Sequence, residues 1–408
     1  MSSTGNGWLP PFLFAMPRMA GTFSHTGLFV LTLPLLVVQI TGPESKGFHL
    51  AFINCSAAFI SLFLLWYAGS FVDRRADGRR HRWFVVTTVS LALPPLAMIA
   101  FVQGYGVVAT AMIAVFLSRV VTDAALLTLL TDDERFRPRE KFTASLVFMH
   151  FLGSIMGAAA FGFFPLSLPL TLSYAFLPVA GVAFVFTSMA LLSFLLVTKD
   201  NGQIGKEKLP LISPLALTVD FKKFLMARSC FLAGILMVPL FLVFMVDDLM
   251  MVEDVKRTSA ELMICLLLGG LLSSCFIEPV VRKVGEVALL LRAGGVLAVV
   301  APVFLFMLSA GSPLVMVCMA IFGACFGAIM VAGTSLSVKL AANTGMSGRY
   351  MALVTMSTFL SQFLASASGG LVLDPLNRLG ENLGYYGLLG IVELFLFCGW
   401  WALRGIKS

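Results

Sequence analysis

The chain has 408 residues, of which 59% are hydrophobic and only 12% are charged. A water-soluble domain needs a polar exterior, so this composition excludes an ordinary globular protein and indicates a chain that folds in a lipid bilayer. The formal net charge is +7, but the basic residues are dispersed over short loops, which excludes a nucleic-acid-binding surface and favours contact with anionic lipid headgroups.

Apolar segments of about 20 residues recur along the chain, and an α-helix of that length crosses about 30 Å of hydrocarbon. Twelve predicted spans lie at 11–39, 47–72, 83–103, 105–130, 142–165, 173–197, 224–246, 258–281, 286–309, 313–338, 350–374 and 383–403. The N-terminal stretch lacks a basic region and a small-residue cleavage site, so we expect it to begin the first helix rather than to be a signal peptide. The predicted fold class is an all-α integral membrane protein with twelve transmembrane helices.

Lys and Arg fall unevenly on the two ends of these spans. If the N-terminus lies inside, 20 of the 28 basic residues lie on the cytoplasmic side, and the opposite side carries only Lys46, Lys256, Arg257 and Arg378. Short loops rich in Lys and Arg stay in the cytoplasm. Both termini are therefore predicted to be cytoplasmic, in a multi-pass plasma membrane protein of a bacterial inner membrane.

The chain divides into two similar halves at its longest polar connection. The predicted units are an N-terminal six-helix bundle at 1–198, a cytoplasmic linker at 199–223 and a C-terminal six-helix bundle at 224–408. Residues 151–162 and 359–370 align without gaps at an offset of 208 residues, close to half the chain, as a duplicated bundle requires. Both stretches are rich in Gly, Ala and Ser, which let membrane helices approach closely, so their helices are predicted to form the seam between the halves.

A charged turn separates the second and third spans. In order along the chain, it contains Gly69, Asp73, Arg74, Gly78, Arg79 and Arg80. This order resembles the signature Gly-x-x-x-Asp-Arg-x-Gly-Arg-Arg of the major facilitator superfamily, although Asp73 and Gly78 are five residues apart instead of three. Arg119, in the middle of the fourth span, matches a second element of that superfamily. The resemblance implies a secondary transporter built from two pseudo-symmetric six-helix bundles.

Two further passages, LPLLVVQITGPESKGF and RPREKFTASLVFMHFLGSIMGAA, resemble the branch of drug:proton antiporters with bacterial macrolide and siderophore exporters. The glycine-proline motif of many antiporters is incomplete, because Gly153, Gly157 and Gly162 have no accompanying Pro. The resemblance implies proton-coupled export of a small amphiphilic compound, drug-like or siderophore-like. The alternative is an importer of a small metabolite, metallophore or lipid. Either way we expect a lipid-embedded monomer that uses a coupling ion and no cofactor.

Charges at cytoplasmic helix ends can form contacts in one transport state that break in the other. By resemblance, Asp73 should face the cytoplasmic end of the eleventh helix, and the arginines of the turn should pair with acidic residues that end the fourth. The predicted gate residues are Gly69, Asp73, Arg74, Gly78, Arg79, Arg80, Asp132, Asp133 and Glu278. The alternative is that the arginines only anchor the topology.

Ionisable groups inside the hydrocarbon are costly and mark functional sites. Arg119 and Asp123 are four residues apart, so they share a helix face and can neutralise each other, either as a structural pair or as a pair that exchanges a proton. The predicted proton-coupling residues are Arg119, Asp123, His150 and Glu393. The predicted substrate-cavity residues are Arg18, His25, Asn54, Ser335, Thr358 and Gln362. Arg228 and Arg292 are predicted to extend toward the headgroups.

The sequence lacks the patterns of membrane enzymes and ATP-driven pumps. It has four His, no His-Glu-x-x-His pair, no Gly-x-Ser-x-Gly turn and no phosphate-binding loop. The seven cysteines lie inside predicted spans without metal-ligand spacing. No catalytic or metal site is predicted, and a channel or a non-transporting receptor on the same fold remains an alternative.

Overall fold

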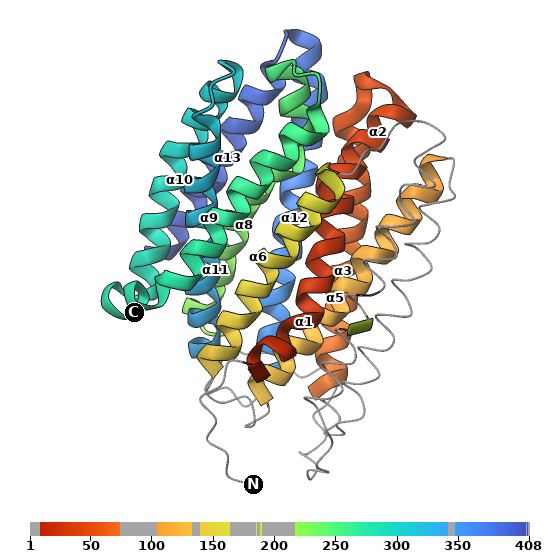
Figure 1. Ribbon diagram of the computed structural model, residues 1–408. Coiled ribbons are helices and arrows are strands. Elements are labelled where there is room, and N and C mark those ends of the chain that lie inside the picture. The colour runs from red at the N-terminus through yellow and green to blue at the C-terminus, as the bar shows by residue number, and fades with distance from the viewer. Residues whose placement is uncertain are drawn as a thin grey trace.

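A computed structural model describes residues 9–73, 104–132, 139–163, 185, 188–189, 217–341, 347–404 and 406. All secondary-structure elements of these residues are helices, which lie roughly side by side (Figure 1). Nine helices of the described part are long and apolar enough to cross a membrane. The chain is thus a multi-pass membrane protein. Two predicted spans, 83–103 and 173–197, lie outside the described residues except for 185 and 188–189.

The first predicted span forms one continuous path through three elements. They are α1 (Leu9–His25), the π-helix η1 (Thr26–Thr32) and α2 (Leu33–Thr41). A single 3-10 turn, η2 (Pro43–Ser45), then leads into α3 (Lys46–Asp73), and the next described helices are α5 (Tyr105–Asp132) and α6 (Arg139–Phe163). These helices cover four of the twelve predicted spans.

The other described helices match the six spans predicted after residue 223. They are α8 (Val219–Met245) with the π-helix η4 (Val246–Met250), α9 (Val255–Val284), α10 (Glu286–Ser309), α11 (Val315–Ala341), α12 (Ser347–Leu379) and α13 (Leu383–Leu403). The predicted linker ends too late, because α8 already begins at Val219. Thr218 caps this helix by accepting a hydrogen bond from the backbone N–H of Phe221, at 3.3 Å.

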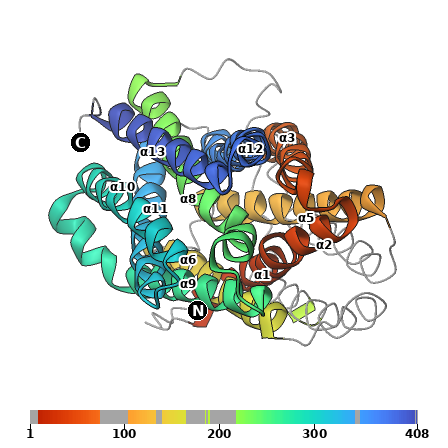
Figure 2. The ribbon, with the colours of Figure 1, turned by 90° about the horizontal axis from the view of Figure 1, so that it is seen from above.

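The two halves of the chain meet along two helix pairs, α3 with α12 and α6 with α9 (Figure 2). The glycines that the internal repeat aligns lie in these pairs. A methyl group on Gly162 would overlap the Cβ of Ala260 on α9, and one on Gly370 would overlap the Cβ of Ala51 on α3. The repeated small-residue stretches therefore lie at the contact between the halves, where glycine permits close backbone approach.

The substitution Gly370→Ala should destabilise the protein by about 1–3 kcal/mol, because the added methyl overpacks the contact with Ala51. Gly295→Ala on α10 is the matched control, since its methyl would meet nothing within 4 Å. That change should be neutral or stabilise by up to about 1 kcal/mol through helix propensity. Thermal unfolding in one detergent compares the two variants, and equal midpoints would contradict this packing.

Candidate functional site

A cavity of about 130 Å³ lies between the two halves, several times the volume that one water molecule needs. Helices α1, η1, α5 and α6 line it from one side, and α8, α9, α11 and α12 from the other. Its apolar lining consists of Val30, Leu146, Val147, Leu232, Leu236, Pro239, Met263, Leu266, Leu267, Phe326, Met330, Met351, Val354 and Phe359. The cavity can therefore receive the apolar part of a small molecule.

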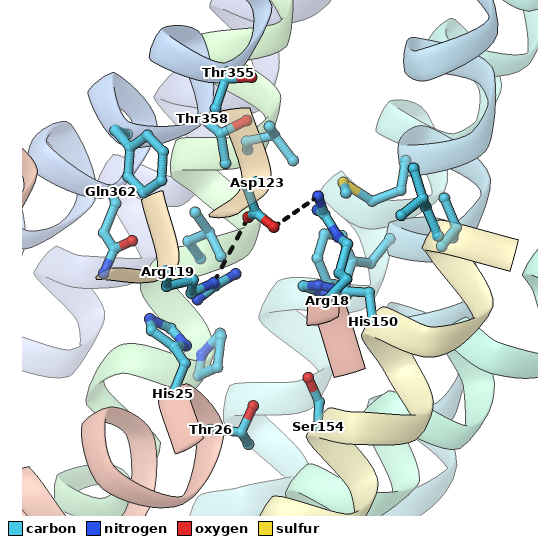
Figure 3. A pocket seen from close by; sticks show the side chains of 18 of the residues that line it. Arg18, His25, Thr26, Arg119, Asp123, His150, Ser154, Thr355, Thr358 and Gln362 are labelled. Atoms are coloured by element: carbon cyan, nitrogen blue, oxygen red, sulfur yellow. Dashed lines mark ion pairs between the residues drawn. The ribbon is translucent and has the colours of Figure 1, made fainter. Parts of the chain in front are cut away.

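Polar side chains enter the cavity from several of these helices (Figure 3). They are Arg18, His25, Thr26, Arg119, Asp123, His150, Ser154, Arg228, Thr334, Thr355, Thr358 and Gln362. Within one helix they recur at intervals of three, four or seven residues, as in Arg18 with His25 and His150 with Ser154. Such intervals place side chains on one face of an α-helix, so α1, α5, α6 and α12 each turn one polar face toward the cavity.

Asp123 lies between two arginines at the centre of this site (Figure 3). Its carboxylate is 3.1 Å from Nη1 of Arg18 on α1 and 3.8 Å from Nε of Arg119 on its own helix. All three side chains are largely buried, with exposed fractions of 8% for Asp123, 13% for Arg18 and 14% for Arg119. The predicted intrahelical pair is thus present, and Arg18 makes it a three-membered cluster. Buried charges of this kind depend on one another for compensation.

Arg228 lies where the sequence did not predict it. Instead of extending to the headgroups, its side chain is buried, with 7% exposed, and lines the cavity from α8. Its Nη2 donates to Thr358 Oγ1 at 3.5 Å, while Nε and Nη1 have no hydrogen-bond partner among the described residues. Arg228 shares a helix face with Leu232 and Leu236, and this face is turned inward. Arg292 is exposed on α10 and can reach the headgroups.

The two predicted cavity histidines also line this site. His25 ends α1 directly before the π-helix η1, and its ring stacks on Phe29 with 5.1 Å between the ring centroids. Nε2 of His25 and Nδ1 of His150 are buried without a hydrogen-bond partner among the described residues. Irregular π-helical turns occur frequently at functional sites. Both rings therefore offer unused polar atoms beside the arginine cluster.

Three predicted site residues lie outside the cavity lining. Asn54 is fully buried on α3, where its side chain donates to the Leu50 carbonyl at 3.0 Å and accepts from Gln362 at 3.4 Å. Ser335 donates to Glu286 at 3.0 Å near one end of α11. Glu393 lies on α13, with a buried Oε1 that has no hydrogen-bond partner in the described part of the chain. Asn54 thus supports a cavity residue from behind, and the other two belong to other regions.

Four of the nine predicted gate residues lie in described helices. Asp73 and Asp132 end α3 and α5, and Gly69 and Glu278 lie within α3 and α9, but their contacts are not described. The residues Arg74, Gly78, Arg79, Arg80 and Asp133 lie outside the described residues. Their gating role stays a prediction.

A second charged cluster joins the halves at the end of the bundle opposite the N-terminus (Figure 1). Lys46 Nζ, at the start of α3, lies 2.7 and 2.8 Å from the two carboxylate oxygens of Asp248 in η4, which also pairs with the hydroxyl of Tyr385 on α13. Asp374 on α12 accepts hydrogen bonds from the backbone N–H groups of Gly47 at 3.1 Å and Phe48 at 2.8 Å. We call Lys46, Asp248, Asp374 and Tyr385 the latch.

Sequence reasoning missed the latch because its residues are up to 339 positions apart. The available signal was Lys46 itself, one of few basic residues on a side with little positive charge. Lys46 is only 5% exposed, so its ammonium depends on Asp248 for compensation. The latch therefore holds α3 of the first half against three elements of the second.

This chain resembles known proteins in its fold and not in its sequence. No family model and no curated protein matches the sequence. Among solved structures, the human organic anion transporter MFSD10 (TETRAN) is 15% identical, with a TM-score of 0.67 over 96% of this chain and 99% of that chain. The nucleoside transporter NupG is 12% identical, with a TM-score of 0.67 over 98% and 100%.

A bacterial homologue of the iron transporter ferroportin is 15% identical and matches in two states. Its inward-facing form gives a TM-score of 0.65 over 97% of this chain and 98% of that chain. Its outward-facing form gives 0.61 over 96% and 98%. Over nearly its whole length, the chain thus shares the fold of these three transporters.

Proposed function

We propose that the chain is a secondary active transporter that works by alternating access. The observation that carries this proposal is the cavity, which helices of both halves line and in which polar groups converge from six α-helices and η1. Alternating access needs a binding site between two units that can rock against each other. The fold shared with three transporters supports the same function.

The latch suggests which conformation the chain adopts. If the N-terminus is cytoplasmic, as the basic residues predict, the latch lies on the outer side and closes it, so that the cavity serves the inner side. The higher TM-score with the inward-facing ferroportin homologue is consistent with this state. Transport would then require the latch to break.

For the coupling step, we propose proton-driven export of a small amphiphilic compound with Asp123 as the proton carrier. Asp123 holds two arginines while it is ionised. Protonation of Asp123 would release both arginines. A substrate bound to the arginines would in turn favour the protonated carboxyl, because the substrate and the ionised Asp123 compete for the same two guanidinium groups. This competition links the substrate to the proton in opposite directions of movement.

Transport in proteoliposomes tests the function. Purified protein is first screened for compounds that raise its thermal unfolding midpoint, and each stabilising compound is then assayed under an imposed pH gradient of either sign. We expect substrate flux that depends on the gradient, with proton counterflow, and no flux in protein-free liposomes. Conductance without substrate would instead show a channel, and binding without flux would show a receptor. The sign of the effective gradient distinguishes export from import.

A further inference from the structure

We propose that Arg228 binds an anionic group of the transported compound, so that the substrate is an amphiphilic organic anion. This inference rests on the proposed transport function and names its substrate class. The shared chemistry is an oxyanion, a carboxylate or a phosphate, attached to an apolar body.

The cavity carries more positive than negative charge. Three arginines line it, and Asp123 is its one acidic residue among the described lining. Asp123 is already shared by Arg18 and Arg119. The predicted spans 83–103 and 173–197, of which only 185 and 188–189 are described, contain no Asp or Glu that could supply another carboxylate from within the membrane. With neutral histidines, the described lining thus has two positive charges in excess.

Arg228 is the arginine left without an ionic partner in this lining. Its Nη2 donates to the neutral hydroxyl of Thr358 at 3.5 Å, and its other two nitrogens have no hydrogen-bond partner among the described residues. Arg228 is only 7% exposed, and a buried guanidinium needs a counter-charge, since burial without one is costly. Its planar fork matches the two oxygens of a carboxylate or phosphate. An anionic ligand would supply what the protein lacks.

The surroundings of Arg228 fit the two parts of such a ligand. Thr358 offers a hydroxyl beside the guanidinium, and Leu232 and Leu236 continue the same helix face as an apolar wall. Gly333 on α11 leaves room for the guanidinium, because a methyl built there would lie 2.6 Å from Nη1. Arg292, on α10 of the second half, is exposed and has no such enclosure.

The test measures thermal unfolding of the full-length protein with four ligands that share a phenylpropyl group and differ in their polar end. They are 3-phenylpropanoate, 3-phenylpropyl phosphate, 3-phenylpropanol and 3-phenylpropylammonium. We expect a saturable rise of the unfolding midpoint with one or both acids and none with the alcohol or the amine. The two acids distinguish a carboxylate site from a phosphate site.

Variants connect the binding to Arg228. Arg228→Gln should weaken binding of the acid about 10- to 100-fold, as expected for loss of a charge-assisted pair. Arg228→Lys should restore part of it. Gly333→Ala should also weaken binding, because the methyl displaces the guanidinium while the charge is kept. Arg292→Gln is the matched control and should leave the affinity unchanged.

The inference is overturned if neither acid stabilises the wild type, if the alcohol or amine stabilises it equally, or if Arg228→Gln binds acids as the wild type does. Should Arg228→Gln fail to fold, the wild-type ligand series and Gly333→Ala still decide. Transport of a neutral or cationic compound without binding of acids would reject the anion site and keep the transporter. Binding of acids without flux of any compound would keep the anion site and reject the transporter.

Discussion

Asp123→Asn should destabilise the protein by about 3–5 kcal/mol, because it removes the shared counter-charge of Arg18 and Arg119 and leaves two buried guanidinium groups uncompensated. The matched control is Glu261→Gln. Arg257 and Glu261 form an ion pair at 3.0 Å with the same i,i+4 spacing, but their side chains are 62% and 33% exposed. Loss of this exposed ion pair should cost at most about 0.5 kcal/mol. Thermal unfolding of both variants in one detergent measures the difference.

The same variant separates a structural pair from a proton carrier. If Asp123 carries the proton, Asp123→Asn should abolish flux driven by a pH gradient while substrate exchange without a gradient persists. The double variant with Arg18→Gln should regain part of the lost stability, because one uncompensated charge is gone. Its coupling should stay lost. Normal gradient-driven flux in Asp123→Asn would show that another group carries the proton.

Lys46→Gln should open the latched end of the bundle. The change removes the ion pair with Asp248 that holds α3 against the second half. Asp248 keeps its hydrogen bond from the Tyr385 hydroxyl, which also lies within hydrogen-bond distance of the Phe244 carbonyl. Loss of a charge-assisted contact of about 1.5–3 kcal/mol corresponds to a shift of roughly 10- to 100-fold toward the open state. Transport should slow, because alternating access must pass through the conformation that is closed at this end, and that conformation becomes rare.

The native Cys55 can report this opening. It lies on α3, and its thiol sulfur is 3.7 Å from the carbonyl oxygen of Phe363 on α12, across the contact that the latch closes. In a background where the other six cysteines are replaced, Lys46→Gln should increase alkylation of Cys55 by a charged maleimide about tenfold or more. Arg378→Gln is the control at the same end, because Arg378 is exposed and donates a long, 3.5 Å hydrogen bond to the Glu44 carbonyl. Unchanged Cys55 reactivity in Lys46→Gln would rule out the latch as a gate.

The helices could be predicted well because their criterion is local. Crossing the hydrocarbon requires a run of apolar residues of fixed length, and the predicted spans 286–309 and 383–403 coincide with α10 and α13 residue for residue. The start of α8 was missed by five residues, because Thr218 caps a helix whose first turn is polar. Helix boundaries outside the hydrocarbon depend on such single hydrogen bonds and not on hydropathy.

The site could be predicted only where it lies within one helix. The pair of Arg119 and Asp123 follows from a spacing of four residues and is present. Arg18 joins that pair from α1, and no local pattern relates it to Asp123. Polar character alone did not identify the cavity lining, because Asn54 and Ser335 are polar residues of spanning helices that do not line the cavity. Asn54 accepts a hydrogen bond from Gln362 behind the lining, and Ser335 donates to Glu286.

By itself, the sequence determined that this chain crosses a membrane many times, that its halves repeat one plan, and which positions carry costly intramembrane charges. Only the tertiary structure decided which faces of the helices turn inward, and so brought Arg18 to Asp123, Arg228 into the cavity and Lys46 to Asp248. The physical reason is the distance along the chain over which each interaction acts. Hydropathy and helical periodicity act over a few residues, whereas helix rotation is set by packing between segments far apart in the chain, such as α3 against α12.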